Sequence, residues 1–408
     1  MRRPVDNPFT PGADAVPTVW AGRSRQIGDW ESILRPRRAS GIYERGRTIL
    51  GEAGLGKSTL VRRIAAEARR QGDWTTDQIR IPLGTDPLKA VASALLRLAD
   101  EAGLAAQRER GIKDTLSRVR SVELAGVGLS VDGGGEPAPH TALTAILVEL
   151  GIAAIRRDAV VLVHIDEVQN ITDGTSLSQL LIGLGDALAH QHTIEVPGGT
   201  TQAYLPIAVY LTGLPEFAEM TAARKGATFA RRFDTTTLVP LDDEDLALAL
   251  RPFVAEGWPV PDEHGGEARI TMTPEAADAI VRLCCGEPFL FQFAGARAWY
   301  AGTGDVITLD DVETGWRDSR REAESHVERI LDRLPERERQ LLEVMAALPA
   351  ADRSATAIAQ AMGFATAAQA GPTAQRLDTV RGIIDRGKPY AFRHRAVEAY
   401  LTSDWPEI

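Results

Sequence analysis

The nine residues GEAGLGKST, at positions 51–59, are the most informative stretch of this chain. They fit the phosphate-loop pattern G-x-x-x-x-G-K-[ST], in which glycines let backbone N–H groups turn toward an anion. The pattern indicates a phosphate loop only where a strand precedes it and a helix follows it. The apolar run RTIL (47–50) predicts the strand, and residues 58–72 carry apolar side chains at helical spacing as far as Gly72. The sequence therefore predicts a loop that binds phosphate groups.

The side chains of the loop indicate its ligand. Lys57 would reach the β- and γ-phosphates of a nucleotide, and Ser58 would coordinate Mg²⁺. The other residues would surround the phosphates at the N-terminus of the following helix. The predicted ligands are ATP and Mg²⁺, and the predicted nucleotide contacts in the loop are Gly51, Glu52, Ala53, Gly54, Leu55, Gly56, Lys57, Ser58 and Thr59.

A second apolar run ends in two carboxylates. AVVLVHIDEVQN (159–170) predicts a strand that is buried on both faces of a parallel sheet, with Asp166 and Glu167 at its carboxyl end. Asp166 would hold Mg²⁺, mostly through water, and Glu167 would polarise the attacking water. This pair favours hydrolysis over binding alone. His164 lies inside the run and is interpreted as a core histidine.

Further strands complete the expected sheet. LPIAVYLTGLPEF (205–217) predicts a strand with Thr212 at its tip, and shorter strands are predicted at 78–83 and 235–241. Thr212 either bonds the attacking water or the γ-phosphate, or it caps the next turn. Strands that alternate with helical stretches indicate a doubly wound α/β layer.

Composition limits the class of protein. The chain has 408 residues, enough for two or three domains, and a formal net charge of −10. Any contact with DNA therefore needs a local basic patch. There is no apolar run of about 18 residues, which argues against a membrane span, and the first residues lack the apolar core of a signal peptide. Cys284 and Cys285 are adjacent, which favours buried thiols in a cytoplasmic protein over a disulfide or a zinc site.

These motifs, in this order, resemble the AAA+ ATPases near the origin-recognition and STAND branches, from about residue 16 to the C-terminus. The resemblance places Gly22 and Arg23 at the adenine pocket and Thr212 at the sensor 1 position. It also matches Gly286-x-Pro288 with a lid element in which Pro288 contacts the nucleotide. The sensor 2 arginine of many relatives is absent, because Phe289 stands near its place and the next arginine is Arg297.

The same resemblance gives a role to two arginines. Arg231 and Arg232 precede the last core strand, where the family carries an arginine finger that acts on the nucleotide of a neighbouring subunit. A finger of this kind implies a homo-oligomer. From the residues alone, a solvated edge or an internal ion pair is the ordinary explanation of such a pair.

The resemblance implies four parts. They are an extended arm at 1–18, a P-loop ATPase core at 19–241 with an inserted hairpin near 121–136, an all-α lid at 242–324, and a winged-helix domain at 325–408. In the lid, Asp242 and Thr273 are expected to cap helices. The third helix of the winged helix is expected at 371–387, with Leu377, Val380 and Ile384 buried.

The partner is less well specified. Residues 372–395 contain six Arg or Lys and two Asp, a net charge of +4, with Lys388, Arg393 and Arg395 in the expected wing. This segment could contact DNA phosphates. It could instead contact a protein or pack on the ATPase as a latch. The favoured function is an ATP-driven switch that oligomerises and regulates a DNA or protein partner. The alternative is a DNA-binding regulator in which ATP turnover is slow and secondary.

Overall fold

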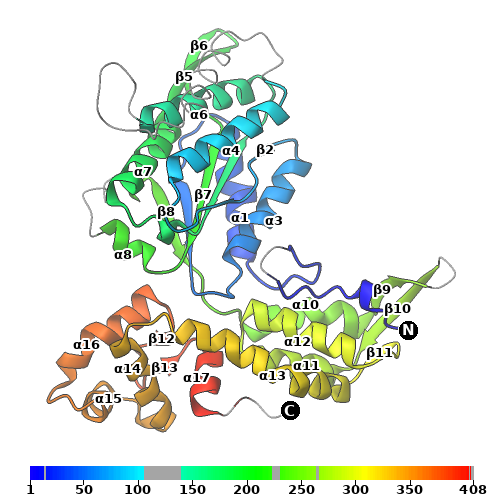
Figure 1. Cartoon of the computed structure of the whole chain (residues 1–408). Helices are drawn as coiled ribbons and strands as arrows, with labels where there is room; N and C mark the ends of the chain where they lie inside the picture. The colour runs from blue at the N-terminus through cyan, green and yellow to red at the C-terminus, as the bar shows by residue number, and fades with distance from the viewer. Residues whose placement is uncertain (13–14, 105–138, 223–229, 263–265, 404, 406–408) are drawn as a thin grey trace. The chain divides into compact units, whose positions relative to one another are not determined.

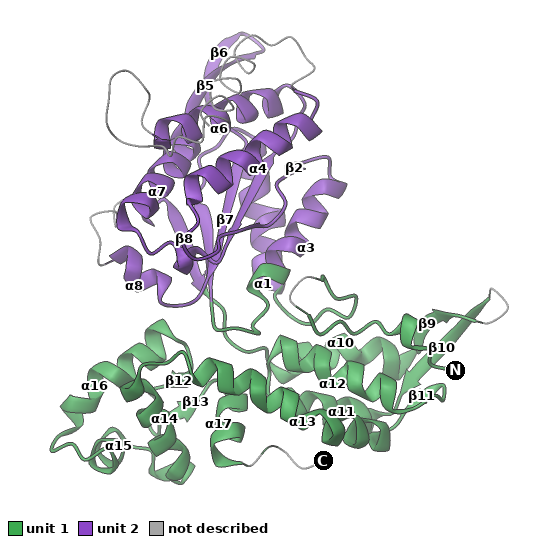
Figure 2. Ribbon diagram, in the orientation of Figure 1, with its two compact units in different colours: residues 1–23, 51–59, 237–408 green, residues 24–50, 60–236 purple. Residues whose placement is uncertain are grey.

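The computed structural model describes residues 1–12, 15–104, 139–222, 230–262, 266–403 and 405 (Figure 1). It divides into two compact units (Figure 2): unit 1 contains residues 1–23, 51–59 and 237–408, and unit 2 contains residues 24–50 and 60–236. The predicted hairpin near 121–136 lies outside the described residues, and the bounds of the four predicted parts stay predictions. Within the described ranges, no helix is long and apolar enough to cross a membrane.

Unit 2 is built on a parallel sheet. Its strands are β1 (Gly46–Leu50), β2 (Trp74–Thr75), β3 (Ile79–Arg80), β4 (Val161–Asp166), β7 (Ile207–Gly213) and β8 (Phe233–Thr237). Their order is β2-β4-β7-β1-β8, and β3 also pairs with β4. The pairings of β1 with β7 and of β4 with β7, β2 and β3 are parallel. Every residue of β1, β4 and β7 is buried, as the apolar runs predicted.

The register of these strands brings their carboxyl ends together. Leu50 of β1 is paired with Gly213 of β7, and Ile165 of β4 is paired with Leu211 of β7. Ligands of α/β proteins bind at this edge of the sheet. The chain continues from Leu50 directly into the phosphate loop.

Helices cover both faces of the sheet. Helices α4 (Pro87–Glu101), α6 (Pro139–Ile155) and α7 (Gly174–Ala189) share a hydrophobic core with one face. On the other face, Tyr210 of β7 packs on Trp30, which lies in a π-helical turn (Trp30–Leu34) between α1 (Ser24–Asp29) and α2 (Arg35–Ala39). This arrangement confirms the predicted α/β fold.

Unit 2 also contains two helices next to the sheet and a separate hairpin. Helix α3 (Lys57–Arg70) follows the phosphate loop, and α8 (Phe217–Ala222) follows β7. An antiparallel hairpin of β5 (Gln191–Val196) and β6 (Gly199–Tyr204) joins α7 to β7 and is largely exposed.

The lid region of unit 1 contains the expected helices and an unexpected sheet. The helices are α10 (Asp243–Ala255), α11 (Pro274–Leu283), α12 (Pro288–Ala301) and α13 (Leu309–Leu331). The expectation that this region is all helix needs correction, because β9 (Trp258–Pro261), β10 (Glu267–Met272) and β11 (Val306–Ile307) form a three-stranded sheet. In β10, Ile270 and Met272 are buried while the residue between them is not, which is the alternation of a strand and not of a helix.

The cap and cysteine predictions can be checked in the same region. The Thr273 hydroxyl accepts a hydrogen bond from the Ala276 N–H at 3.2 Å, whereas Asp242 occupies the N-cap position of α10 without a side-chain cap bond. Cys284 and Cys285 are free and buried, as predicted. Burial raises the pKa of the Cys285 thiol to about 12, so this thiol is unreactive at neutral pH.

The N-terminal arm packs against the lid helices. Phe9 stacks on Phe253 of α10, with ring centroids 5.3 Å apart, and meets the edge of Phe291 of α12. Arg2 donates to Asp311 of α13 at 2.9 Å. A 3₁₀ turn covers Pro4–Asp6. The arm is therefore part of the core of unit 1.

The C-terminal region, residues 325–408, begins within α13 and holds small helices and a hairpin. Its elements are α14 (Glu336–Ala347), a 3₁₀ turn (Ala350–Asp352), α15 (Ala355–Ala361), α16 (Ala367–Gln375), a π-helical turn (Arg376–Val380), β12 (Ile384–Asp385), β13 (Ala391–Phe392) and α17 (Arg395–Thr402). The predicted helix at 371–387 is too long. It ends before Gly382, whose φ of +69° favours glycine and stops a helix, and Ile384 lies in a strand. Leu377 and Ile384 are buried as predicted, but Val380 is only half-buried.

Candidate active site

The phosphate loop is curled at the N-terminus of α3. Gly54 and Gly56 have φ values of +87° and +79°, which side chains rarely adopt. A Cβ on Gly56 would meet no atom closer than Pro288 at 3.8 Å. The Lys57 ammonium is nearly buried and donates to the Glu52 carbonyl oxygen at 3.0 Å. A curled loop with a lysine at a helix N-terminus has the geometry of an anion site.

Arg23 contacts the backbone of this loop. Its guanidinium donates to the Leu55 carbonyl oxygen at 3.0 Å. Burial lowers the pKa of Arg23 to about 10, against the opposing effect of Asp245 and Asp242, so the group is charged at neutral pH. A Cβ on Gly22 would lie 2.6 Å from the Asp245 carboxylate, so glycine is required there. The structure thus brings the predicted Gly22–Arg23 pair to the loop.

The lid also meets the loop. The Phe289 N–H donates to the Gly54 carbonyl oxygen at 3.2 Å. If Gly56 had a Cβ atom, its nearest neighbour would be Pro288. Helix α12 therefore begins against the loop at the predicted Pro288. Arg297 pairs with Glu322 at 2.6 Å and does not replace a sensor 2 arginine in this arrangement.

The Glu52 side chain joins the loop to two distant segments. Its carboxylate is buried and lies 2.9 Å from Arg333, just beyond the end of α13, and 3.7 Å from Arg381 in the C-terminal region. Arg381 is buried as well and donates to Glu338 of α14 at 3.1 Å. Sequence reasoning included Glu52 only as a loop residue and missed both arginines.

A second buried carboxylate, Glu287, lies beside the loop. His326 Nε2 is 2.7 Å and His394 Nδ1 is 3.4 Å from its oxygens. Burial opposes its ionisation, but the hydrogen bonds to the two histidines outweigh burial and lower the pKa of Glu287 to about 2. The His326 ring lies directly against the loop, because a Cβ on Gly54 would be only 2.5 Å from it. No sequence pattern predicts this cluster, because its members lie far apart along the chain.

In unit 2, two neutral side chains donate hydrogen bonds to Asp166. Its carboxylate accepts hydrogen bonds from the Thr212 hydroxyl and from the Gln78 amide. Because Thr212 donates its single proton to Asp166, it must accept from His164, whose Nε2 lies 2.9 Å away. Burial lowers the pKa of His164 to about 4, against the effect of Asp166, so this imidazole is neutral. The core histidine is thus also the partner of the predicted sensor threonine.

Glu167 follows directly in an unusual conformation. Its φ of +60° is left-handed, which is uncommon for a residue with a side chain. Its carboxylate accepts a hydrogen bond from the Gln169 amide. Wherever the structure describes the chain, no three His, Cys, Asp or Glu residues come together to hold a metal ion on their own.

The two predicted finger arginines differ. Arg232 forms an ion pair with Asp186 of α7 at 2.6 Å and packs on Gly185. Arg231 is exposed and has no ion-pair partner among the described residues. Arg231 is therefore the better candidate for a contact with another subunit.

The basic segment 372–395 is largely neutralised by acids of unit 1. Arg376 and Arg381 pair with Glu338, Arg386 and Arg393 pair with Asp378, and Arg395 pairs with Asp243. Lys388 is exposed. The net charge of the segment therefore overstates the positive surface that it offers to DNA.

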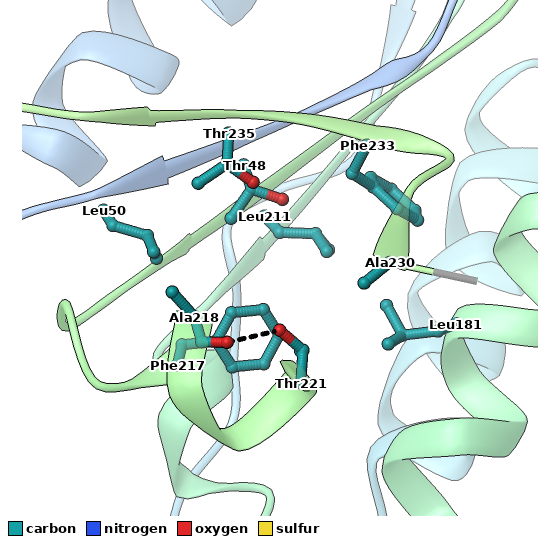
Figure 3. A pocket seen from close by; sticks show the side chains of 10 residues that line it. All are labelled: Thr48, Leu50, Leu181, Leu211, Phe217, Ala218, Thr221, Ala230, Phe233 and Thr235. Atoms are coloured by element: carbon teal, nitrogen blue, oxygen red, sulfur yellow. Dashed lines mark hydrogen bonds between the residues drawn. The ribbon is translucent and has the colours of Figure 1, made fainter. Parts of the chain in front are cut away.

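Unit 2 also contains a small pocket between the sheet and helices α7 and α8 (Figure 3). Thr48, Leu211 and Thr235 line it from the strands, and Leu181 and Phe217 line it from the helices. None of its lining residues is titratable, so the pocket offers no group for acid–base chemistry.

Comparison with known proteins places the fold. No family model matches the chain, and a search of curated proteins found no match. A Walker-type ATPase of Pyrococcus abyssi resembles it with a TM-score of 0.55 and 13% identity, over 94% of this chain and 96% of that chain. The ORC2 protein of Aeropyrum pernix, in ADPNP and ADP complexes, resembles it with a TM-score of 0.50 and 16% identity, over 96% and 97%. Together with the sheet order, these similarities show an α/β fold of the P-loop NTPase type.

Proposed function

We propose that this chain is an ATP-driven molecular switch in which the phosphate loop controls the C-terminal region. The observation that carries the proposal is the pairing of Glu52, a loop residue, with Arg333 and Arg381. A loop that only bound nucleotide would not need charged ties to Arg333, 281 residues further along the chain, and to Arg381 beyond it.

Binding of the nucleotide follows from the loop. Gly54 and Gly56 supply the backbone conformations, Lys57 supplies the charge, and the space beside Gly56 admits a phosphate oxygen. Arg23 donates a hydrogen bond to the loop and Pro288 lies near Gly56, and both are proposed to complete the nucleotide contacts. The ADPNP and ADP complexes of the A. pernix protein support this assignment.

Hydrolysis is assigned to the acidic end of β4. Glu167 would polarise the attacking water, and Thr212 would hold Asp166 through its hydroxyl. Ser58 and Asp166 are proposed to hold Mg²⁺ together with phosphate oxygens and water. The bound ion supplies charge neutralisation on the phosphates. The strand register, which aligns the ends of β1, β4 and β7, supports this division of roles.

The charge of the nucleotide explains how the switch would work. A triphosphate adds negative charge next to Glu52 and competes with it for Arg333 and Arg381. Loss of the γ-phosphate removes part of this competition. The strength of the ties between the loop and the C-terminal region would therefore follow the nucleotide state.

We propose that the chain works as a homo-oligomer, with Arg231 as a finger on the neighbouring subunit. Arg231→Ala should lower turnover about a thousandfold without weakening nucleotide binding, whereas Arg232→Ala should change turnover little. Mixing Arg231→Ala with Lys57→Ala chains should restore part of the activity, because each supplies what the other lacks. Steady-state phosphate release measures both effects, and equal loss in the two arginine variants would refute the assignment.

The regulated partner is proposed to be a protein, because five of the six basic residues in 372–395 pair with acids of the same chain. The alternative, a DNA-binding regulator with slow turnover, needs a free positive surface. Duplex DNA binding by the full chain that weakens steeply with salt would support that alternative instead.

The direct test of the nucleotide site is Lys57→Ala. Lys57 serves the ligand, so the variant should fold normally and lose measurable ATP binding and turnover. Lys89→Ala is a matched control, because Lys89 is an exposed lysine of α4 outside the motifs. Equal ATP affinity in Lys57→Ala and the wild type would refute the proposed site.

A further inference from the structure

The Gln169 side chain bridges two functional segments of unit 2. Its Nε2 donates to the Glu167 carboxylate, and its Oε1 accepts a hydrogen bond from the Leu214 N–H at 3.0 Å. Leu214 follows β7 directly, two residues after Thr212. The amide therefore links the proposed water-activating acid to the end of the strand that carries the sensor threonine.

The orientation of this amide is fixed by its neighbours. The Leu214 N–H can only donate, so it must face the amide oxygen. The amide nitrogen then points at Glu167, and a carboxylate is the acceptor that such a donor requires. Both ends of the Gln169 amide are thus used, and a flipped amide would lose both bonds.

The end of β7 is shaped to admit Gln169. A Cβ on Gly213 would lie 2.7 Å from Gln169 Oε1 and 2.8 Å from Val168 Cγ2, so only glycine allows this approach. On the other side, Glu167 adopts its left-handed backbone just before the 3₁₀ turn Val168–Asn170, which carries Gln169. Conformations of this kind cost about 1 kcal/mol or more and persist where the surroundings enforce them.

Both carboxylates are therefore tied to the same strand end. Asp166 is bonded by the Thr212 hydroxyl, and Glu167 is bonded through Gln169 to Leu214. Residues 212–214 thus hold the two acids in one fixed relation. A movement of this strand end would displace Glu167 as well as Asp166.

We propose that Gln169 is a positioning residue for ATP hydrolysis, which keeps the Glu167 carboxylate in register with the end of β7. This inference rests on the proposed function. Gln169 acts through Glu167 and not on the nucleotide. Its loss should lower kcat by about tenfold to a hundredfold, because a general base must hold its geometry closely, and should leave KM for ATP nearly unchanged.

Two substitutions at Gln169 distinguish its hydrogen bond to Glu167 from its hydrogen bond to Leu214. Gln169→Met has nearly the same length and removes both bonds. Gln169→Glu keeps an acceptor for the Leu214 N–H but loses the donor to Glu167, so it should be at least as slow as Gln169→Met. Gln71→Met is the matched control, because Gln71 also donates to a glutamate, Glu67, at 2.8 Å on an exposed helix end. The control should turn over ATP like the wild type.

The decisive experiment combines Gln169→Met with Glu167→Gln in the full chain, with turnover, ATP affinity and melting temperature measured for each variant. If Gln169 acts through Glu167, the double variant should have the same residual turnover as Glu167→Gln alone. Multiplied losses, or a raised KM, would show that Gln169 acts elsewhere and would overturn the inference. Wild-type turnover in Gln169→Met would also overturn it, while an inactive wild type would overturn the proposed function with it.

Discussion

The phosphate loop and the acidic end of β4 hold buried carboxylates in different ways. Glu52, in the loop, is paired with the guanidinium groups of Arg333 and Arg381, which come from the far end of the chain. Asp166, at the end of β4, accepts bonds from the hydroxyl of Thr212 and the amide of Gln78. The two residues are about equally buried, because the exposed fraction of Glu52 is 1% and that of Asp166 is 2%.

The difference suits two tasks. Ion pairs between charged groups are sensitive to any further charge that arrives, and a nucleotide brings several negative charges. Hydrogen bonds from neutral donors respond less to such a charge and fix geometry. Under the proposed function, the loop would transmit the state of the nucleotide, and the hydrogen bonds of the acidic strand would keep its proposed catalytic groups in place.

The substitution Glu52→Gln tests the ion pairs of the phosphate loop. The change leaves two guanidinium groups without their buried partner, and should lower the free energy of unfolding by about 2 kcal/mol. The value lies below the usual range for a buried ion pair because Arg333 is partly exposed and Arg381 keeps Glu338. Urea unfolding measures it. Glu67→Gln on α3 is the control, and equal small losses in both variants would remove the special role of Glu52.

The substitution Thr212→Val tests the hydrogen bonds that the Thr212 hydroxyl makes to Asp166 and His164. The valine keeps the shape of the side chain but leaves the His164 N–H and Asp166 each without one bond, so we expect a loss of about 1.5 kcal/mol in unfolding free energy. Turnover should fall while ATP affinity is retained. A variant as stable and active as the wild type would show that this hydroxyl does not hold the acid.

The stability of the region around Asp166 should depend on pH through His164. The pKa of His164 is lowered to about 4 in the folded chain, below its usual value near 6.5, so the unfolded chain binds the extra proton first as pH falls. Its contribution to stability is fully present above about pH 6.5 and is lost as pH falls toward 4. His164→Gln should flatten this part of the unfolding profile by up to about 3 kcal/mol, the free energy that corresponds to the lowered pKa. An unchanged profile would contradict a neutral His164.

The sequence predicted what is local in both regions. The loop, the strand that ends in Asp166 and Glu167, and Thr212 were found from patterns of a few residues. The groups that hold them were not found, because they are distant along the chain. Gln78 lies 88 residues from Asp166, and Arg333 lies 281 residues from Glu52.

The helix that ends early illustrates the same limit. Apolar spacing through Leu377, Val380 and Ile384 predicts a continuous helix. In the fold, Arg381 turns inward to Glu338 and Glu52, and Gly382 adopts a left-handed conformation. Tertiary pairing overrides periodicity there, and no local pattern marks the buried arginine. The strand Glu267–Met272 is not predicted, because its alternation is short and lies between two stretches with helical patterns.

If nucleotide in the loop loosens the C-terminal region, hydrogen–deuterium exchange in that region should respond to nucleotide. The Glu167→Gln chain should be compared with and without Mg-ATP, with AMP as the control. We predict faster exchange in peptides from residues 376–402 with ATP only, and no such response when Lys57→Ala is added. Bound ATP that protects the loop while leaving exchange in residues 376–402 unchanged would contradict the switch.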